Sequence, residues 1–349
     1  MGRKNYISVF IILACVASTS CTKDDTGGSE PQAQRQISFA PTTLSSDDAA
    51  ESRGVPIDNS TLPNFGVLAS HNAGAWTSAS TPNYIYNSKV MRVGATNVWV
   101  CDPLQYWPPS GKLSFFAYSP YYATGSSVVQ LSGSATGGIP TLTYQTPEAV
   151  AEQPDLLFAA PAYDRELATG QVSMNFSHIL SSITFSAKLG DALSSGISNM
   201  VVRGVSVSGL KTKATYTHGA TTPWSFATTQ TPQTYAVSVD GGQLDSKTLT
   251  ITAQSISKAN GDIMMPIPQP ITADVIVAVR VSYTKAGVAI PQEITLEKAL
   301  SATNLTALEI SKKYNILLSV TLGTLTEITV SYQVIEWQDG GNITIPPVN

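Results

Sequence analysis

The three histidines, which are the residues best suited to metal or acid–base chemistry, lie far apart in the sequence, at His71, His178 and His218. None belongs to an HExxH motif or another paired spacing, so the sequence predicts no zinc site. His178 stands between Phe176 and Ile179 in a strand-like segment, which favours a packed, hydrogen-bonded structural histidine. Neither a Gly-x-Ser-x-Gly elbow nor a Walker loop is present. We therefore predict no catalytic residues, no metal and no cofactor.

Two other residue classes could act on a sugar or bind one. The carboxylates are dispersed, so nothing supports the acid pair that hydrolyses a glycosidic bond. The tryptophans could stack on a glycan, although such residues more often pack in a core. They are Trp76, Trp99, Trp107, Trp224 and Trp337. A monomeric, glycan-binding surface lipoprotein is therefore the alternative function, and a secreted hydrolase is a remote third.

The composition excludes further classes. The chain has 349 residues with 20 Lys+Arg against 24 Asp+Glu, a net charge of −4 and no basic block, so nucleic acid is not an expected partner. Only 13% of residues are charged, against 42% hydrophobic, which excludes a charge-rich coiled coil. The 25 Gly and 21 Pro interrupt helices almost everywhere, and the Ser-, Thr-, Val- and Ile-rich stretches between them favour strands. We predict an all-β protein.

Many short strands are expected between the turn signals. In the last of them, Ile328, Val330, Tyr332 and Val334 alternate with polar residues, the period of a strand with one buried face. The predicted strands are Phe65–Ala69, Val98–Cys101, Leu113–Tyr118, Val128–Leu131, Gln171–Phe176, Ile183–Leu189, Met200–Ser208, Thr248–Ala253, Val275–Tyr283, Tyr314–Leu322 and Ile328–Trp337. The helical candidates are short, Leu189–Leu193 and Leu296–Leu300.

The first 21 residues have the features of a secretory signal, with Arg3 and Lys4 before an apolar segment and small residues before Cys21. Cleavage just before a cysteine resembles bacterial lipoprotein processing, which would make Cys21 the diacylated N-terminus. Cys15 is the alternative acceptor. With both committed to the signal or to lipid, Cys101 has no disulfide partner and is expected to be a small core residue.

Residues 22–35 lack an aliphatic or aromatic anchor and are predicted to be a flexible tether. Within them, Lys23 followed by Asp24 and Asp25 resembles the signal that directs lipoproteins of the Bacteroidetes to the outer face of the outer membrane. The alternative is a solvated tether without sorting information.

Six phrases, in the same order, resemble those of the fimbrillin-like proteins of Bacteroidales. The first is a Trp-Pro turn that leads into an aromatic strand, and the last is a tryptophan followed by a glycine pair. The phrases are Tyr106–Pro120 (YWPPSGKLSFFAYSP), Gln153–Ala159 (QPDLLFA), Val172–Leu180 (VSMNFSHIL), Met265–Gln269 (MPIPQ), Lys313–Ile316 (KYNI) and Glu336–Gly341 (EWQDGG). The resemblance extends from about residue 37 to the C-terminus.

This resemblance implies a subunit of an adhesive surface fimbria, exported as a lipoprotein and polymerising with itself or with other fimbrial subunits. It also implies a host protein or glycan as a further partner. The implied fold is two tandem transthyretin-like β-sandwich domains of antiparallel Greek-key topology. We place the division after a Gly- and Pro-punctuated stretch, giving residues 36–170 and 171–349.

In such proteins a protease cuts after an arginine and removes a leading strand, and a neighbour's strand fills the groove. Arg53, followed by Gly54, stands where that cut is expected, and Arg35 is an alternative position. Ile37 and Phe39 are the alternating residues of the strand to be removed. Arg53 could instead be an ordinary loop residue.

The C-terminal segment is the candidate donor strand. Gly340 and Gly341 would let the chain swing out and present Ile343 and Ile345, which lie two apart and so face the same side of a strand. The alternative is that this tail packs on its own domain.

Overall fold

The computed structural model describes residues 35–43, 57, 61–167, 170–237, 247–257, 263–323 and 326–337. The described residues belong to one compact unit. Their helical segments are single 3-10 turns, such as η1 (Val150–Glu152) and η3 (Leu300–Thr303), and the regular structure is otherwise strand. None of the described helices has the length and apolarity that crossing a membrane would require. The prediction of an all-β protein is confirmed.

The first half of the chain builds an eight-stranded sheet in the order β2-β3-β4-β1-β10-β8-β5-β9. A further pairing of β2 with β5 closes all of these strands except β9 into a ring around a hydrophobic core. The strands are β1 (Ser38–Thr43), β2 (Phe65–Asn72), β3 (Ile85–Arg92), β4 (Trp99–Asp102), β5 (Lys112–Ser119), β8 (Leu157–Ala159), β9 (Ala162–Arg165) and β10 (Val172–His178).

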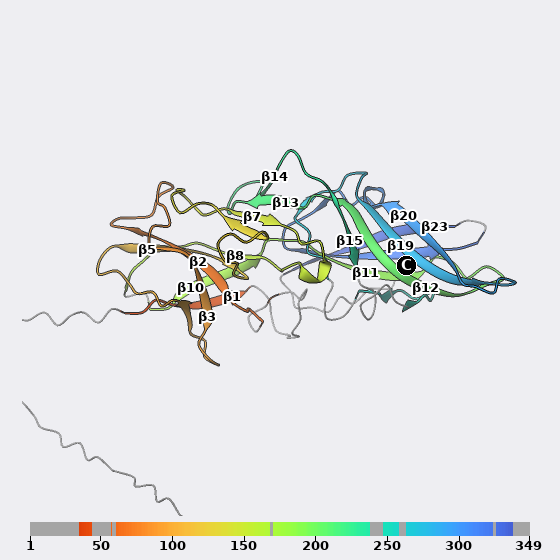
Figure 1. Ribbon diagram of the computed structural model, residues 1–349, viewed down its shortest axis with the longest axis horizontal. Coiled ribbons are helices and arrows are strands. Elements are labelled where there is room, and N and C mark those ends of the chain that lie inside the picture. The colour runs from red at the N-terminus through yellow and green to blue at the C-terminus, as the bar shows by residue number, and fades with distance from the viewer. Residues whose placement is uncertain are drawn as a thin grey trace, which may run out of the picture. The chain divides into compact units, whose positions relative to one another are not determined.

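In the second half, a four-stranded sheet in the order β17-β11-β22-β23 and a five-stranded sheet built on β15-β12-β19-β20 contribute to one hydrophobic core. The long strands β12 and β19 lie side by side (Figure 1). The strands are β11 (Ser182–Leu189), β12 (Ile197–Leu210), β15 (Gln233–Val237), β16 (Lys247–Thr248), β17 (Gln254–Ser255), β19 (Ile276–Lys285), β20 (Gln292–Ala299), β22 (Lys312–Thr321) and β23 (Glu327–Glu336).

A third cluster of buried side chains, which we call the middle core, combines residues from both halves of the chain. It includes Tyr118 and Phe158 from the first sheet, Trp224, and Trp337 directly after β23. Two small sheets complete the fold, ordered β14-β13-β7-β6 and β18-β21. Their strands are β6 (Val129–Leu131), β7 (Leu142–Gln145), β13 (Lys213–Tyr216), β14 (Trp224–Phe226), β18 (Gln269–Pro270) and β21 (Ala307–Leu308).

The prediction of antiparallel sheets is wrong for two strand pairs. β1 runs parallel to β10, and β11 runs parallel to β22. Parallel neighbours need a long connection, and more than a hundred residues separate the strands in each pair, so the chain has ample length to return in the same direction. The tandem transthyretin-like arrangement and the division between residues 170 and 171 stay predictions. β10, which follows that division, pairs with β1 and β8.

Both predicted helices are wrong. Leu296–Leu300 falls mostly in β20, which pairs with β19 from Tyr283 to Ile276. Ile294 and Leu296 pack toward the core and alternate with exposed polar residues, so tertiary pairing overrides the helix propensity of this segment. Leu189 ends β11, and the residues after it are not helical. The strand predicted at Thr248–Ala253 is reduced to the short β16, which ends at Thr248.

Candidate functional site at the leading strand

The first described strand fills a slot in the large sheet. Its register with β10 runs from Phe39 to Thr43, and its register with β4 covers Ser38 and Phe39. Just before it, the Ile37 N–H donates to the Gln105 carbonyl oxygen at 2.8 Å. We call residues 37–43 the leading strand. Because it alone separates β4 from β10 in the strand order, its removal would leave an unpaired edge on each of them.

The first two residues on the inward face of the leading strand are fully buried. Ile37 and Phe39 are both 0% exposed, so the expected alternation of these two residues is confirmed. The Phe39 ring meets Phe65 and Phe115 edge-on, with ring centroids 5.7 and 5.5 Å apart. A strand that left this slot would empty an aromatic pocket. A strand that replaced it would need large apolar side chains at alternate positions.

The two edges of the leading strand are held unequally. Pro41 has no N–H to donate to a neighbouring strand. The register with β4 ends at Phe39, whereas the register with β10 continues to Thr43. The Thr42 hydroxyl adds a hydrogen bond to Asn175 Oδ1 at 2.8 Å. Side-chain burial and the β10 edge therefore provide most of the attachment.

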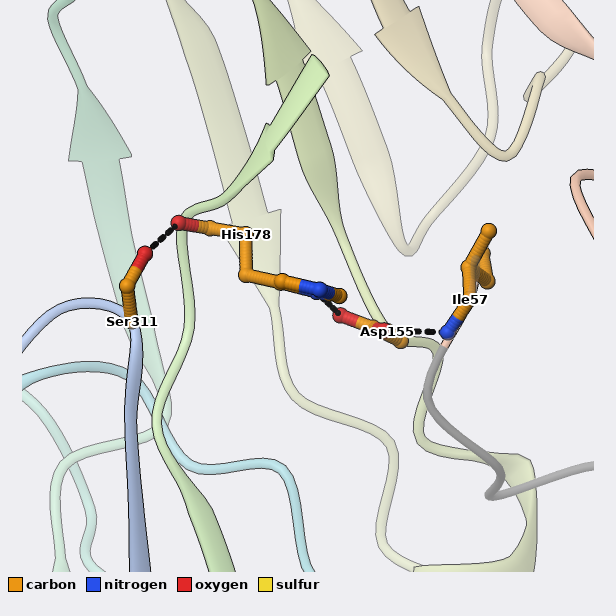
Figure 2. Close-up of polar contacts among 4 residues, drawn as sticks. All are labelled: Ile57, Asp155, His178 and Ser311. Atoms are coloured by element: carbon orange, nitrogen blue, oxygen red, sulfur yellow. Dashed lines mark hydrogen bonds and ion pairs between the residues drawn. The ribbon is translucent and has the colours of Figure 1, made fainter. Parts of the chain in front are cut away.

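Downstream of the leading strand, the chain is fixed again at Ile57 by a buried carboxylate. The Ile57 N–H donates to Asp155 Oδ2 at 2.7 Å, and the other carboxylate oxygen, Oδ1, lies 2.9 Å from His178 Nδ1 (Figure 2). A carboxylate can only accept, so the His178 ring donates from Nδ1. Each oxygen of the buried Asp155 carboxylate thus accepts a hydrogen bond, which offsets the cost of burying a polar group.

His178 is in turn held from the C-terminal side. Its ring stacks on Trp337 with centroids 4.3 Å apart and an interplanar angle of 16°. The backbone N–H of Trp337 donates to the Ser311 carbonyl oxygen at 2.9 Å. The Ser311 hydroxyl donates to the His178 carbonyl oxygen. The Lys313 ammonium lies 5.6 Å from the centre of the Trp337 ring. Burial lowers the pKa of Lys313, and the Asp155 carboxylate offsets part of that shift.

These residues do not form a catalytic triad despite the serine, histidine and aspartate. The Ser311 hydroxyl is bonded to a backbone oxygen, and the free ring nitrogen of His178, Nε2, is buried without a partner among the described residues. A nucleophile activated by this histidine would have to reach that nitrogen. The arrangement supports a structural histidine, 6% exposed, as the sequence predicted.

The structure also confirms two predictions about packing. Cys101 is buried, and burial raises the pKa of its thiol to about 12, as expected of a core residue. Four of the tryptophans are buried in cores, and the fifth, Trp76, is partly buried against Tyr163 and Phe116.

Several predicted site residues lie outside the described residues: Cys21, Arg53, Gly54, Ile343 and Ile345. Their roles stay predictions. Arg35, the alternative cut position, is described and exposed, and its carbonyl oxygen accepts the Trp107 N–H at 2.9 Å. It lies at a hollow of about 490 Å³ that is also lined by Pro108 and Lys112.

The bond between Asp155 and His178 was not predicted. The two residues are 23 apart in sequence, and no local pattern joins them. The antiparallel pairing of β8 with β10 sets Leu157 opposite His178 and so brings the preceding segment to the ring. A signal was present, because both residues lie in phrases that carried the family resemblance.

Comparisons with known proteins agree with this geometry. The model of a family described as fimbrillin-like matches residues 57–337, a span that begins at Ile57 and ends at Trp337. The fold is similar to that of a fimbrial protein from Bacteroides vulgatus, with a TM-score of 0.65 and 20% identity over 87% of this chain and 100% of that one. It is also similar to a candidate cell adhesion protein from Bacteroides uniformis, with a TM-score of 0.53 and 15% identity over 86% and 98%. No curated protein matches significantly.

Proposed function

The chain belongs to the fimbrillin-like family, and from this premise we propose that it is a structural, adhesive subunit of a cell-surface fimbria. It polymerises with copies of itself or with related subunits. The observation that carries the proposal is the position of the leading strand. It fills a slot between β4 and β10 and buries Phe39 in an aromatic pocket, so a strand of another subunit could replace it.

Assembly proceeds in this proposal by strand exchange after a cut at Arg53. Removal of the leading strand exposes backbone groups along the edges of β4 and β10, and an incoming strand pairs with them. Ile343 and Ile345 of a neighbour are two residues apart, like Ile37 and Phe39, so they can fill adjacent pockets. Each contributes about 1.5–3 kcal/mol if fully buried there.

The precursor is, in this proposal, a lipoprotein on the outer face of the outer membrane. The support is the apolar leader that ends at Cys21 and the Lys23-Asp24-Asp25 run after it. Surface display suits a subunit that must meet both a protease and its neighbours outside the cell.

Replacing Cys21 with serine is expected to abolish lipidation and to release the protein from the membrane fraction, because serine cannot form the thioether to the lipid. Mass spectrometry of the mature N-terminus checks this. Lipid found on Cys15, or an unmodified terminus elsewhere, would contradict the assignment of the anchor. Changing Lys23, Asp24 and Asp25 together to alanine provides the matched control: the protein should stay lipidated but lose accessibility to protease on whole cells.

Treating the folded protein with an Arg-specific protease is expected to give Gly54 as the new N-terminus and to permit oligomers. The Arg53→Ala protein should stay intact and monomeric, since its leading strand still fills the slot. N-terminal sequencing and size-exclusion chromatography provide the readouts. Protease-treated wild type should therefore form oligomers, whereas Arg53→Ala should form almost none, because an occupied slot cannot accept a second strand.

Two further arms locate the cut and the donor. Oligomers that form equally well from an Arg53→Ala, Arg35→Ala protein would show that neither cut gates assembly. Deleting Gly340–Asn349 should leave a folded subunit that accepts a strand but donates none, so it caps chains. Long polymers of the deleted protein would place the donor elsewhere, and loss of folding would mean that the tail belongs to its own domain.

A further inference from the structure

The carboxylate of Asp155 holds the chain at the point where the connection from the leading strand re-enters the fold. Between Thr43, the last residue of β1, and Ile57, the chain has 13 residues, numbered 44–56, and the predicted cut lies among them. Ile57 is 9% exposed and belongs to the core of the first sheet. Its N–H is the donor to Asp155 Oδ2 (Figure 2).

Asp155 is itself held by residues that come later in the chain. His178 donates to its second oxygen, and the His178 ring is clamped by the stack on Trp337 and by the bond from Ser311. His178 lies on β10, which pairs with the leading strand, but the contacts with Trp337 and Ser311 come from the C-terminal part of the chain and hold the ring independently of that pairing. The family match has its limits at the same cluster, at Ile57 and at Trp337.

We propose that Asp155 is a latch that fixes the boundary between the removable part of the chain and the retained part. When the leading strand leaves, the chain before Ile57 goes or becomes a short free end, and Ile57 keeps its hydrogen bond to Asp155. New chain ends normally fray unless something ties them down. Without the carboxylate, fraying would extend from the new N-terminus toward β2, whose Phe65 lines the pocket that Phe39 fills. This inference rests on the proposed processing.

The test compares hydrogen exchange before and after cleavage in the full-length protein. The readout is the exchange rate of the Ile57 amide, measured by mass spectrometry in the peptide covering residues 54–64, because the first amides of a peptide do not retain their label. In the wild type this peptide should keep its protection after the cut. In Asp155→Ala the cut should speed its exchange about tenfold or more, whereas the uncut variant should change less because the leading strand still tethers the chain. An effect that appears only after cleavage distinguishes a latch from general stabilisation.

Two variants serve as controls. In Asp155→Asn the amide oxygen can still accept the Ile57 N–H, and the amide nitrogen can donate to His178 Nδ1 once the ring proton moves to Nε2, so protection should be largely rescued. Asp164→Ala removes a similar bond, from the Trp76 N–H to Asp164 Oδ1 at 2.8 Å, and should leave residues 57–64 unchanged. If Asp155→Ala does not fold, Ile57→Pro removes the donor together with the buried side chain, and Ile57→Val, which keeps the N–H, is its control: only the proline variant should show the cut-dependent loss.

Three outcomes would overturn the latch. Asp155→Ala could keep wild-type protection after the cut, Asp155→Asn could be as exposed as Asp155→Ala, or the wild type could itself lose protection on cleavage. If Arg53 resists the protease, a Glu-specific protease acting after Glu51 breaks the same connection, so the latch is still tested. Protection that depends on Asp155 in a cut protein that never polymerises would support the latch while refuting the proposed assembly.

Discussion

Replacing Phe39 with alanine is expected to lower the free energy of unfolding of the uncut protein by about 3–5 kcal/mol, the usual cost of emptying a buried aromatic site. The ring is 0% exposed and packs edge-on against Phe65 and Phe115, so neighbouring side chains cannot easily close the cavity. Denaturation with urea measures the effect as a lower midpoint at constant slope. The same cavity weakens the grip on the leading strand, so the uncut variant should also take up a donor strand more readily.

Two comparisons make this prediction specific. Thr42→Ala changes an exposed residue of the same strand and loses only its hydrogen bond to Asn175, so it should cost no more than about 1 kcal/mol. After cleavage at Arg53 and loss of the leading strand, wild-type and Phe39→Ala proteins have identical remaining chains. Their stabilities must then converge. A difference that persists would show that residue 39 stays with the body of the protein.

Strand positions could be predicted where apolar residues recur at every second position, although Val334 in the segment Ile328–Val334 is 43% exposed and not part of a buried face. The alternation from Ile328 to Val334 predicted a strand at Ile328–Trp337, and β23 spans Glu327–Glu336. The signal was weaker in β3 (Ile85–Arg92), where asparagine, serine and lysine interrupt the apolar residues, and this strand was missed. Propensity misled at Leu296–Leu300, because the pairing of β20 with β19 decides its conformation.

The residues of the candidate site also differ in whether a local pattern or long-range strand register determines their position. Ile37 and Phe39 could be identified because the family resemblance implies a removable leading strand, and alternation within that strand is local information. The hydrogen bond from His178 to Asp155 depends on which residues of β8 and β10 are opposite each other. No local pattern contains that register. The parallel pairing of β1 with β10 is hidden for the same reason, since it joins segments separated by more than a hundred residues. Long-range register therefore limits what the sequence alone can reveal here.

Replacing Trp337 with alanine is expected to lower the free energy of unfolding by about 3–5 kcal/mol. Trp337 is 1% exposed, belongs to the middle core and stacks on His178, so its loss removes buried area and the support of the ring that orients Asp155. The Lys313 ammonium loses its ring partner as well. The effect should extend to residues 57–64, just before β2, whose exchange rate should rise because the His178 ring that orients Asp155 has lost its stacking partner.

Trp337→Phe separates the ring from the indole nitrogen. That nitrogen, Nε1, is buried without a hydrogen-bond partner among the described residues, so removing it sacrifices no bond and relieves an unsatisfied donor. Phenylalanine keeps a flat ring for His178 and Lys313, and its smaller volume should cost only about 1 kcal/mol. Equal stability losses for Trp337→Ala and Trp337→Phe in urea denaturation would mean that the stack contributes little. A clearly larger loss of stability in Trp337→Ala than in Trp337→Phe, with faster exchange at residues 57–64 only in the alanine variant, would support the coupling. It would show that Trp337 stabilises the contacts of Ile57 through His178 and Asp155.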